Sequence, residues 1–402
     1  MITVLSLNCG SSSLKFDVRR VDRAYAEPDV LVARGSIDGI GSVDGRDVTF
    51  SLSTDAGEER GASSARDHFA AFHESMRLLA PAISGAPIDA VGHRVVHGGV
   101  EFRAPARIDA RVISAIESAA RLAPLHNRPA LDTIAASRAW LGDATPMVAT
   151  FDTAFFADLP DVAATYAIPT AISEALQIRR FGFHGIAHRY MVERYHLLHP
   201  ERKTPRIISL QLGAGCSVTA SVGGRPLDTS MGFTPLEGLM MATRSGDIDP
   251  SLPLYMAEQQ GRSLADVTAL LHHESGLLGL SGQSGDLRVL LGAAAGGDPR
   301  ADLAVRAFCY RIQKYVGAYL AVLGGADAVI FGGGIGEHSP DVRRAVCAPF
   351  AWAGLHIDDG ANVIDSAADR HISSSAASIE AWVIPVDEAA VIAADTAACL
   401  QV

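Results

Sequence analysis

At three positions, an arginine or a histidine that can bind an anion lies near glycine. Arg94, His184 and Arg244 each lie in a glycine-containing turn at the end of a strand-like run. A guanidinium grips carboxylate or phosphate with two parallel hydrogen bonds, and ligands of α/β proteins bind at the ends of strands. The three positions therefore predict an anion site, although a single loop arginine is more often a surface ion pair and a single histidine more often structural.

Glycine-rich turns occur at three places and can offer backbone N–H groups to phosphate oxygens. Residues 8–15 combine Gly10 with serines and Lys15 between two strand-like runs. Residues 213–217 repeat the pattern without lysine, and residues 332–336 place glycines between a strand and a helix. None has the GxxxxGK[ST] spacing of a P-loop. Since glycines mostly mark turns, the matching pair of turns in two similar halves is the more informative signal.

Carboxylates stand at two of the expected element ends. Asp152 follows a strand-like run, and Asp387 and Glu388 begin the last expected helix. A carboxylate near a phosphate site is a candidate Mg²⁺ ligand, directly or through water. Negative charge at a helix N-terminus also stabilises the helix by itself, and spacing alone leaves both interpretations open.

The order of the expected elements indicates an α/β protein with two domains. Both halves open with a glycine-tipped hairpin, after which helices and strands alternate. We expect two domains of related topology around a cleft: residues 1–150, joined by the closing helix 388–402, and residues 151–387. Strands are expected at 2–7, 14–18, 30–33, 48–52, 90–96, 147–151, 206–212, 217–222, 329–331 and 382–384, and helices at 65–80, 107–121, 129–140, 251–272, 301–323, from about 340, and at 388–401.

The composition argues against several classes of partner. The 402 residues are 48% hydrophobic and 20% charged, and the formal net charge is −11. A nucleic acid or an anionic membrane needs a basic surface, so we expect neither as a partner. Without a signal-peptide pattern or a long apolar run, we expect a cytoplasmic protein. Five cysteines form no metal-binding pair and are expected to be buried thiols: Cys9, Cys216, Cys309, Cys347 and Cys399.

Together these segments resemble the acetate kinase family, within the sugar kinase, Hsp70 and actin superfamily. The resemblance extends from Asn8 to Glu388, and its longest part is DTSMGFTPLEGLMMATRSGDIDP at 228–250. The resemblance implies two actin-like, or ribonuclease H-like, domains of duplicated topology. Shorter matches are NCGSSSLKF at 8–16, HRVVHGG at 93–99, PLHN at 124–127, FDTAF at 151–155, FGFHG at 181–185, GGIGE at 333–337 and PVDE at 385–388.

The resemblance also implies an activity, which is reversible phosphoryl transfer between ATP and acetate by a homodimer that uses Mg²⁺, or Mn²⁺ in its place. The implied metal ligands are Asn8 and Glu388. The implied catalytic and anion-binding residues are Arg94, Asp152, His184 and Arg244, and the acid's pocket adds Val96, Leu125, Phe183 and Pro235. The implied ATP contacts, mostly in the second domain, are Ser11, Ser13, Lys15, Gln211, Gly213, Ala214, Gly215, Asp286, Leu287, Arg288, Gly334, Ile335, Gly336, Glu337 and His338.

The chemistry agrees with these roles. Carboxylic acids titrate around pH 4, so acetate is already an anionic nucleophile and needs no strong general base. The difficulty is to bring two anions together and to stabilise charge on the phosphoryl oxygens. We therefore expect Asp152 to orient an arginine or a metal-bound water instead of taking a proton.

Departures from the family pattern gather around the phosphoryl donor. They leave open a different donor such as pyrophosphate, a propionate or other short-chain acyl kinase, and a catalytically weak nucleotide-binding paralogue. A sugar kinase is disfavoured by the two arginines and the apolar wall, and the bulk of Val96 favours acetate over propionate. The departing residues are Phe156, Gln211, Ala214, Gly285, Gly332, His338, Val386 and Asp387.

Overall fold

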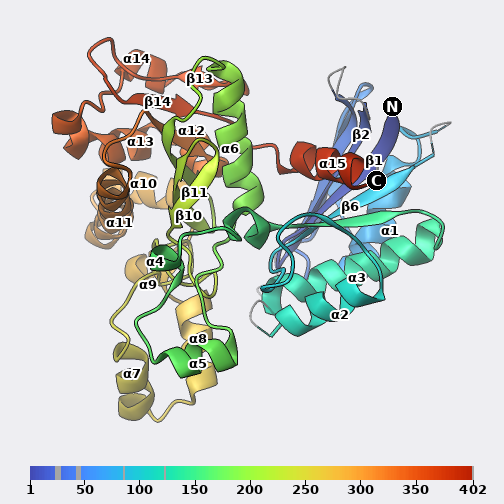
Figure 1. The fold of residues 1–402 in the computed structure, drawn as a ribbon, viewed down its shortest axis with the longest axis horizontal. Helices are drawn as coiled ribbons and strands as arrows, with labels where there is room; N and C mark the ends of the chain where they lie inside the picture. The colour runs from blue at the N-terminus through green and yellow to red at the C-terminus, as the bar shows by residue number, and fades with distance from the viewer. Residues whose placement is uncertain (23–28, 42–46, 85–86, 122–123, 401–402) are drawn as a thin grey trace. The chain divides into compact units, whose positions relative to one another are not determined.

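The chain folds into two compact units. In this computed structural model the described residues are 1–22, 29–41, 47–84, 87–121 and 124–400, and of residues 124–126 the backbone only. One unit comprises Met1–Ala157 and Asp387–Val402, and the other comprises Asp158–Val386. Each unit has its own sheet and its own helices (Figure 1). Among the described residues, no helix has the length and apolar character needed to cross a membrane.

A mixed sheet with the order β5-β4-β3-β2-β1-β6-β8-β7 forms the centre of the first unit. Strands β1 to β5 pair antiparallel, whereas β6 runs parallel to β1 and β8 parallel to β6. The β1–β2 pairing continues to Cys9 opposite Leu14, which leaves the glycine-serine turn at the tip of the hairpin. The strands are β1 (Ile2–Cys9), β2 (Ser13–Val21), β3 (Val30–Asp38), β4 (Thr49–Thr54), β5 (Gly57–Ala62), β6 (Ala90–Val95), β7 (Ala106–Arg107) and β8 (Met147–Phe151).

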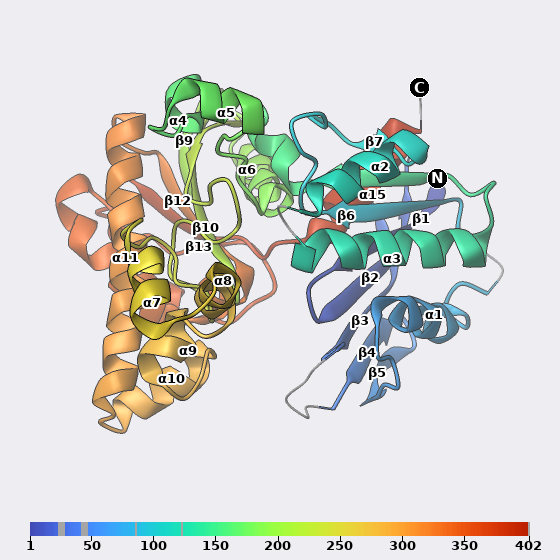
Figure 2. The same ribbon diagram turned by 90° about the horizontal axis from the view of Figure 1, so that it is seen from below.

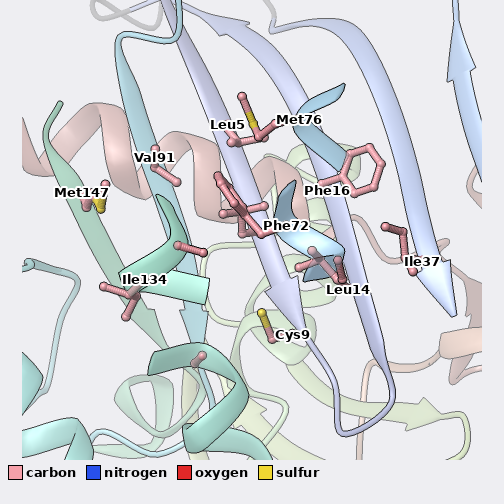
Figure 3. Packing of buried hydrophobic residues seen from close by; sticks show 14 of the residues in the cluster. Leu5, Cys9, Leu14, Phe16, Ile37, Phe72, Met76, Val91, Ile134 and Met147 are labelled. Carbon is pink, nitrogen blue, oxygen red and sulfur yellow. The ribbon is translucent and has the colours of Figure 1, made fainter. Parts of the chain in front are cut away.

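Helices cover both faces of this sheet (Figures 1 and 2). α1 (His68–Leu79), α2 (Ala110–Ala119) and α3 (Pro124–Leu141) pack on one face, and a short 3₁₀ helix, η1 (Asp152–Phe156), follows β8. The core on this side joins Phe72 of α1 and Ile134 of α3 to Leu5 and Phe16 of the sheet (Figure 3).

The opposite face of the sheet is covered by α15 (Glu388–Cys399), from the far end of the chain (Figure 1). Ala393 and Ala397 of this helix pack against Ile2 and Val4 of β1. Neighbouring residues of a strand point to opposite faces, so β1 supplies Leu5 to one core and Val4 to the other. β1 is therefore buried on both sides, and α15 completes a unit that begins at the other end of the sequence.

The second unit is built on a sheet with the order β11-β10-β9-β12-β14-β13. β9, β10 and β11 pair antiparallel, whereas β12 runs parallel to β9 and β14 parallel to β12. Along the order β3-β2-β1-β6-β8 in the first unit and β11-β10-β9-β12-β14 in the second, the strand directions are the same. The predicted α/β class with duplicated topology is confirmed. The strands are β9 (Arg206–Leu212), β10 (Cys216–Val222), β11 (Arg225–Thr229), β12 (Ala328–Gly332), β13 (Arg370–His371) and β14 (Glu380–Val383).

α6 packs on one face of the second sheet and α11 on the other (Figure 1). Met191 and Tyr195 of α6 contact Ile207 of β9 and Ile330 of β12 in one buried cluster. The helices of this unit are α4 (Asp161–Ala164), α5 (Thr170–Leu176), α6 (Gly185–Leu198), α7 (Leu252–Gln260), α8 (Leu264–His273), α9 (Gly276–Ser281), α10 (Leu287–Ala295), α11 (Pro299–Leu323), α12 (Gly333–His338), α13 (Pro340–Cys347), the 3₁₀ helix η2 (Ala348–Ala353) and α14 (Asp359–Asn362).

The expected helix over 251–272 is wrong as a single element. α7 ends at Gly261, which has φ +61°, and α8 starts after Ser263, whose side chain forms a capping box with Asp266. A left-handed glycine followed by a capping box stops one helix and starts another, and this local pair outweighs the continuous apolar spacing. The sequence predictions also omitted several elements, among them β5, β11, α6, α9 and α10.

Candidate active site

Arg94 and Asp152 form the centre of a charged cluster in the first unit. Arg94 lies near the end of β6, and Asp152 follows directly after the parallel neighbour β8. Nη2 of Arg94 is 2.7 Å from Oδ2 of Asp152, and its Nε is 3.2 Å from Oδ1. Asp152 is fully buried. Because the carboxyl ends of parallel strands meet at one edge of a sheet, the topology brings these two residues together.

Asn8 and Glu388 complete this cluster. Nη1 of Arg94 donates to Oδ1 of Asn8 at 2.9 Å and to Oε2 of Glu388 at 3.2 Å. The amide of Asn8 donates to the same Glu388 oxygen at 2.5 Å. Burial opposes the charged form of Arg94, but the carboxylates of Asp152 and Glu388 outweigh it and raise the pKa of Arg94. Four predicted site residues, widely separated in sequence, thus lie in direct contact.

Asp387 fixes the start of α15, next to Glu388. It is the N-cap of this helix, and its Oδ2 accepts from Nη2 of Arg19 at 2.6 Å and from Nη2 of Arg34 at 2.8 Å. Asp17 bonds both arginines from β2. Burial alone would raise the pKa of Asp387, but the two guanidinium groups outweigh it and lower the pKa. This group, Asp17, Arg19, Arg34 and Asp387, is called the α15 clasp below.

The β1–β2 turn contains the predicted contacts Ser11, Ser13 and Lys15. The N–H of Gly10 donates to the carbonyl of Ser13 at 2.9 Å, which closes the turn, while Ser11 and Lys15 are exposed. Nε2 of His68 lies 2.9 Å from the carbonyl oxygen of Gly10 and ties the turn to α1. Lys15 stands directly opposite Asn8 in the β1–β2 register.

His184 and Arg244 lie over the same glycine in the second unit. A Cβ placed on Gly215 would be 3.3 Å from Nε2 of His184 and 3.7 Å from Nη1 of Arg244. Arg244 donates to the carbonyl of Pro235 at 3.2 Å. Burial lowers the pKa of Arg244, only partly opposed by the Cys216 thiol. A cation whose charged form is disfavoured by burial is stabilised by a bound anion. A side chain at position 215 would press on the imidazole of His184.

A cavity of about 700 Å³ lies in the second unit, close to the β9–β10 turn. Its volume suits an organic ligand of the size of a nucleotide. Eight of the predicted ATP contacts line it, together with residues that the sequence predictions did not assign to ATP. The predicted ones are Gly213, Ala214, Asp286, Leu287, Arg288, Gly334, Ile335 and His338, and the others are Ala242, Gly285, Leu291, Ser339, Pro340 and Asp341.

Four further predicted ATP contacts, Gln211, Gly215, Gly336 and Glu337, do not line this cavity. The expected glycine turn at 332–336 is mostly helical, because α12 begins at Gly333, and the carboxylate of Glu337 accepts from the N–H of Gly333 at 2.8 Å. The carbonyl of Gly336 accepts from a buried guanidinium, and Oε1 of Gln211 is buried without a hydrogen-bond partner among the described residues. An unsatisfied buried amide oxygen is a candidate acceptor for a hydrogen-bond donor of a ligand.

The predicted acid-pocket residues belong to both units. Val96 follows β6 in the first unit and is buried, and Phe183 is buried in the second unit just before His184. Pro235 is buried, and its carbonyl accepts a hydrogen bond from Arg244. The side chain of Leu125 lies outside the described part of the structure.

Comparison with known proteins identifies the family. A sequence profile described as "Acetokinase family" matches residues 3–394. The chain belongs to the acetokinase family. An acetate kinase of Solibacter usitatus is 44% identical over 99% of this chain and 98% of its own. A solved acetate kinase of Porphyromonas gingivalis has 36% identity and a TM-score of 0.87 with full coverage of both chains. A propionate kinase of Francisella tularensis has 34% identity and a TM-score of 0.89, covering 98% of this chain and 99% of that one.

Several departures from the acetokinase pattern lie in contact with the cavity or with each other. Ala214, Gly285 and His338 all line the cavity. A Cβ on Gly332 would lie 2.6 Å from Cγ2 of Val386, so these two departures occupy one space and belong together. Three of these departures therefore line one cavity, and two others are in contact with each other.

The sequence predictions missed two groups of supporting residues in this acetokinase. One is the α15 clasp: the sequence predictions considered only Asp387, as a charge at a helix N-terminus, and its pairing with Arg19 and Arg34 gives no local signal. The other consists of Ser209, Ser217 and His188 behind His184. For the second group a partial signal existed, because Ser217, Thr219 and Ser221 alternate on one expected strand, and His184 and His188 are four residues apart, one helical turn.

Proposed function

We propose that this protein is a cytoplasmic acetate kinase that transfers the γ-phosphoryl group of ATP to acetate, reversibly. The observation that carries the proposal is family membership over residues 3–394, together with relatives named acetate kinase at 42–44% identity over 96–100% of the chain. The charged cluster and the cavity described above support it, because they match the two needs of the reaction: an anion site and room for a nucleotide.

The reaction balances without an external base. One carboxylate oxygen of acetate forms a bond to the γ-phosphorus while the bond from that phosphorus to the β–γ bridging oxygen breaks. The electron pair of the broken bond stays with ADP, and acetyl phosphate is the other product. Acetate is already ionised at neutral pH, so the protein must position the reactants and stabilise the planar phosphoryl oxygens.

In the first unit, Arg94 would bind the anions and Asp152 would hold it in place. The bidentate contact of the buried Asp152 with Arg94 supports this division of roles, since it fixes the plane of the guanidinium. An arginine held by a carboxylate keeps its geometry before substrate arrives, which is the condition for effective electrostatic catalysis. Asp152 is then a positioning residue.

In the second unit, His184 and Arg244 would donate hydrogen bonds to the travelling phosphoryl group. Their common location over Gly215 supports this role, as does the lowered pKa of Arg244. The cavity lined by Gly213, Asp286 and Ile335 would hold the nucleotide. Removing one donor that acts on a transition state typically lowers the rate on the order of 10²–10³-fold.

Mg²⁺ would be held by Asn8 and Glu388. Both offer oxygen atoms, which Mg²⁺ prefers, and they lie in contact at the end of the β1 strand. When bound, the ion would neutralise phosphate charge, and kinases usually hold it with one or two protein oxygens plus phosphates and water. Among the described residues no group of three or more His, Cys, Asp or Glu side chains could hold a metal, which agrees with a site completed by substrate.

The remaining parts of the proposal concern organisation. The first unit would handle the acid and the migrating phosphoryl group, and the second would bind the nucleotide and form a homodimer. Acetate is preferred over propionate because six similar relatives are named acetate kinase and because Val96 is bulky. One methylene in an apolar pocket changes binding by about 1–3 kcal/mol.

One assay tests this function and its alternatives together. Purified protein is incubated with MgATP and a series of C2 to C4 carboxylic acids, and hydroxylamine traps the acyl phosphate while ADP is measured separately. We expect acetate to give the highest kcat/KM. Pyrophosphate replaces ATP in a parallel series, because Ala214 and Gly285 change the donor side. Tight ATP binding with no acyl phosphate from any acid would contradict the proposal and favour a nucleotide-binding paralogue.

A further inference from the structure

Behind His184 a chain of hydrogen bonds runs into the interior of the second unit. Nδ1 of His184 lies 3.0 Å from Oγ of Ser217, and the same Oγ lies 2.7 Å from Nε2 of His188. Nδ1 of His188 lies 2.8 Å from Oγ of Ser209. Ser209, Ser217 and His188 are all fully buried. This group of three residues is called the buried relay below.

The local sequence explains why these residues meet. Ser209 on β9 pairs with Thr219 on β10, so Ser217, two residues away from Thr219, points to the same face of the sheet as Ser209. That face is the one covered by α6, where residues four apart lie one above the other. His184, the N-cap of α6, and His188 therefore stand over the two serines. His184 has φ +57°, which a non-glycine residue keeps only when its surroundings hold it there.

The direction of the hydrogen bonds follows from the end of the relay. His188 is neutral because burial lowers its pKa to about 3, so one ring nitrogen donates and the other accepts. Among the described residues, the hydroxyl of Ser209 has His188 as its one hydrogen-bond partner. If Ser209 accepted from His188, its own buried hydrogen would have no acceptor, which is costly. Ser209 therefore donates to Nδ1 of His188, and His188 donates from Nε2 to Ser217.

This direction determines the form of His184. Ser217 accepts from His188 and must use its own hydrogen to donate to Nδ1 of His184. A His184 ring that accepts at Nδ1 is neutral and carries its hydrogen on Nε2. Nε2 is the atom that lies with Nη1 of Arg244 over Gly215. The N–H thus faces the spot where an anion would be held.

We propose that Ser209, His188 and Ser217 are positioning residues that fix His184 as the neutral tautomer with its hydrogen on Nε2, ready to donate to the phosphoryl group. The inference rests on the proposed function for the identity of the acceptor. It adds that the histidine acts as a neutral donor beside Arg244, so the positive charge at this spot comes from the arginine alone. It also explains why three fully buried polar side chains stand in the interior of the unit.

The tautomer can be measured without turnover. Protein labelled with ¹⁵N-histidine gives two-bond ¹⁵N–¹H correlations that distinguish the two neutral tautomers from each other and from imidazolium, and the His184→Ala variant identifies the signal. We expect the Nε2–H form for His184 at pH 7 and a mixture of forms in Ser217→Ala. A dominant Nδ1–H or imidazolium form in the wild-type protein would overturn the proposal.

Kinetics supply the second test, with a matched control. Ser217→Ala should lower kcat by about 10–100-fold with little change in KM for MgATP or acetate, as expected when the partner that orients a functional imidazole is lost. Ser209→Ala should lower kcat less, because two bonds remain. Ser221→Ala is the control: it removes a buried hydroxyl from the same face of β10, bonded to the carbonyl of Ile207, outside the buried relay. Its kcat should match the wild type.

A double-mutant cycle separates this inference from the proposed function. Ser217→Ala in a His184→Ala background should lower kcat by no more than about twofold, because the relay acts only through the missing ring. An equal loss of kcat in the wild-type and His184→Ala backgrounds would show that Ser217 has a general structural role, and it would overturn the proposal. Wild-type turnover of His184→Ala alone would instead overturn the role of His184 in the proposed reaction, whichever tautomer the spectra report.

Discussion

The first hairpins of the two units are built on the same pattern but end in different chemistry. Asn8 stands opposite Lys15 one step before the tip of β1–β2, and Gln211 stands opposite Ser217 one step before the tip of β9–β10. The neighbouring parallel strand brings Arg94 to Asn8 in the first unit, whereas it places Gly332 opposite Gln211 in the second. Beside the end of its first strand, the first unit therefore has an arginine, whereas the second unit has a glycine.

The two units also differ in the electrostatic surroundings of their arginines. In the first unit, buried charges are compensated within the chain, since Asp152 and Glu388 raise the pKa of Arg94. In the second unit, small residues leave a cavity, and burial lowers the pKa of Arg244. In the first unit the cation is therefore paired with carboxylates of the same chain, whereas the second unit has a cavity and a cation whose charged form burial disfavours.

The largest expected effect concerns the first unit, where Arg94 is paired with carboxylates. Arg94→Ala removes an anion-binding group and leaves the buried carboxylate of Asp152 without its cation. We expect kcat to fall on the order of 10²–10³-fold and stability to fall by about 3–5 kcal/mol. Steady-state kinetics and chemical denaturation measure the two losses, with the exposed Arg20→Ala as control. Near-normal turnover of Arg94→Ala would remove the assignment.

Arg244→Ala should be nearly as harmful to the reaction but much less so to the fold. The same loss of about 10²–10³-fold in kcat is expected, while the melting temperature should change little, because burial already disfavours this cation. Addition of MgADP should raise the melting temperature of the wild type more than that of the variant. The exposed Arg225→Ala on β11 is the matched control. Equal destabilisation by Arg94→Ala and Arg244→Ala would break the contrast between the units.

From the sequence alone, the local structure of both units could be predicted in part. Alternating apolar residues and glycine-tipped turns predicted both hairpins, and the terminal helix was expected from its apolar content. The contact of Arg94 with Asp152 and Glu388 was implied only by the family resemblance, because it depends on parallel pairing of β1, β6 and β8 and on the docking of α15. Ser217 and His188 were missed because strand register places Ser217 near Ser209 and because the helix that carries His188 was not predicted, although the spacing of the two histidines was a partial signal.

Substitutions of Asp387 test the α15 clasp of the first unit, and their expected effect is smaller. Asp387→Asn keeps a good N-cap residue but removes two ion pairs of the α15 clasp, so we expect a loss of about 1 kcal/mol that shrinks at high salt. Asp387→Ala loses the cap as well and should cost about 1 kcal/mol more. Because Glu388 follows directly, KM for Mg²⁺ should rise in both variants. Identical denaturation curves for the two variants would show that the cap contributes nothing.

The smallest expected effect concerns the cavity of the second unit. Ala214→Asn adds an amide at the cavity wall that can reach phosphate, so KM for ATP should fall a few-fold, as one net hydrogen bond is worth about 0.5–1.5 kcal/mol. Gly285→Ser, a second substitution at the cavity wall, is expected to destabilise the protein instead. Its Cβ would lie 2.9 Å from the carbonyl oxygen of Ala242. A raised KM in Ala214→Asn would mean that the alanine suits the donor of this enzyme.

The docking of α15 on β1 has a consequence for biogenesis. The second unit is a continuous stretch, residues 158–386, whereas the first is discontinuous and receives its last helix only after that stretch has been made. At about 5–20 residues per second, the ribosome takes roughly 10–45 s to cover this interval. During that time the Ile2 and Val4 side of the nascent sheet has no helix over it, so a chaperone that shields this surface should act before α15 emerges.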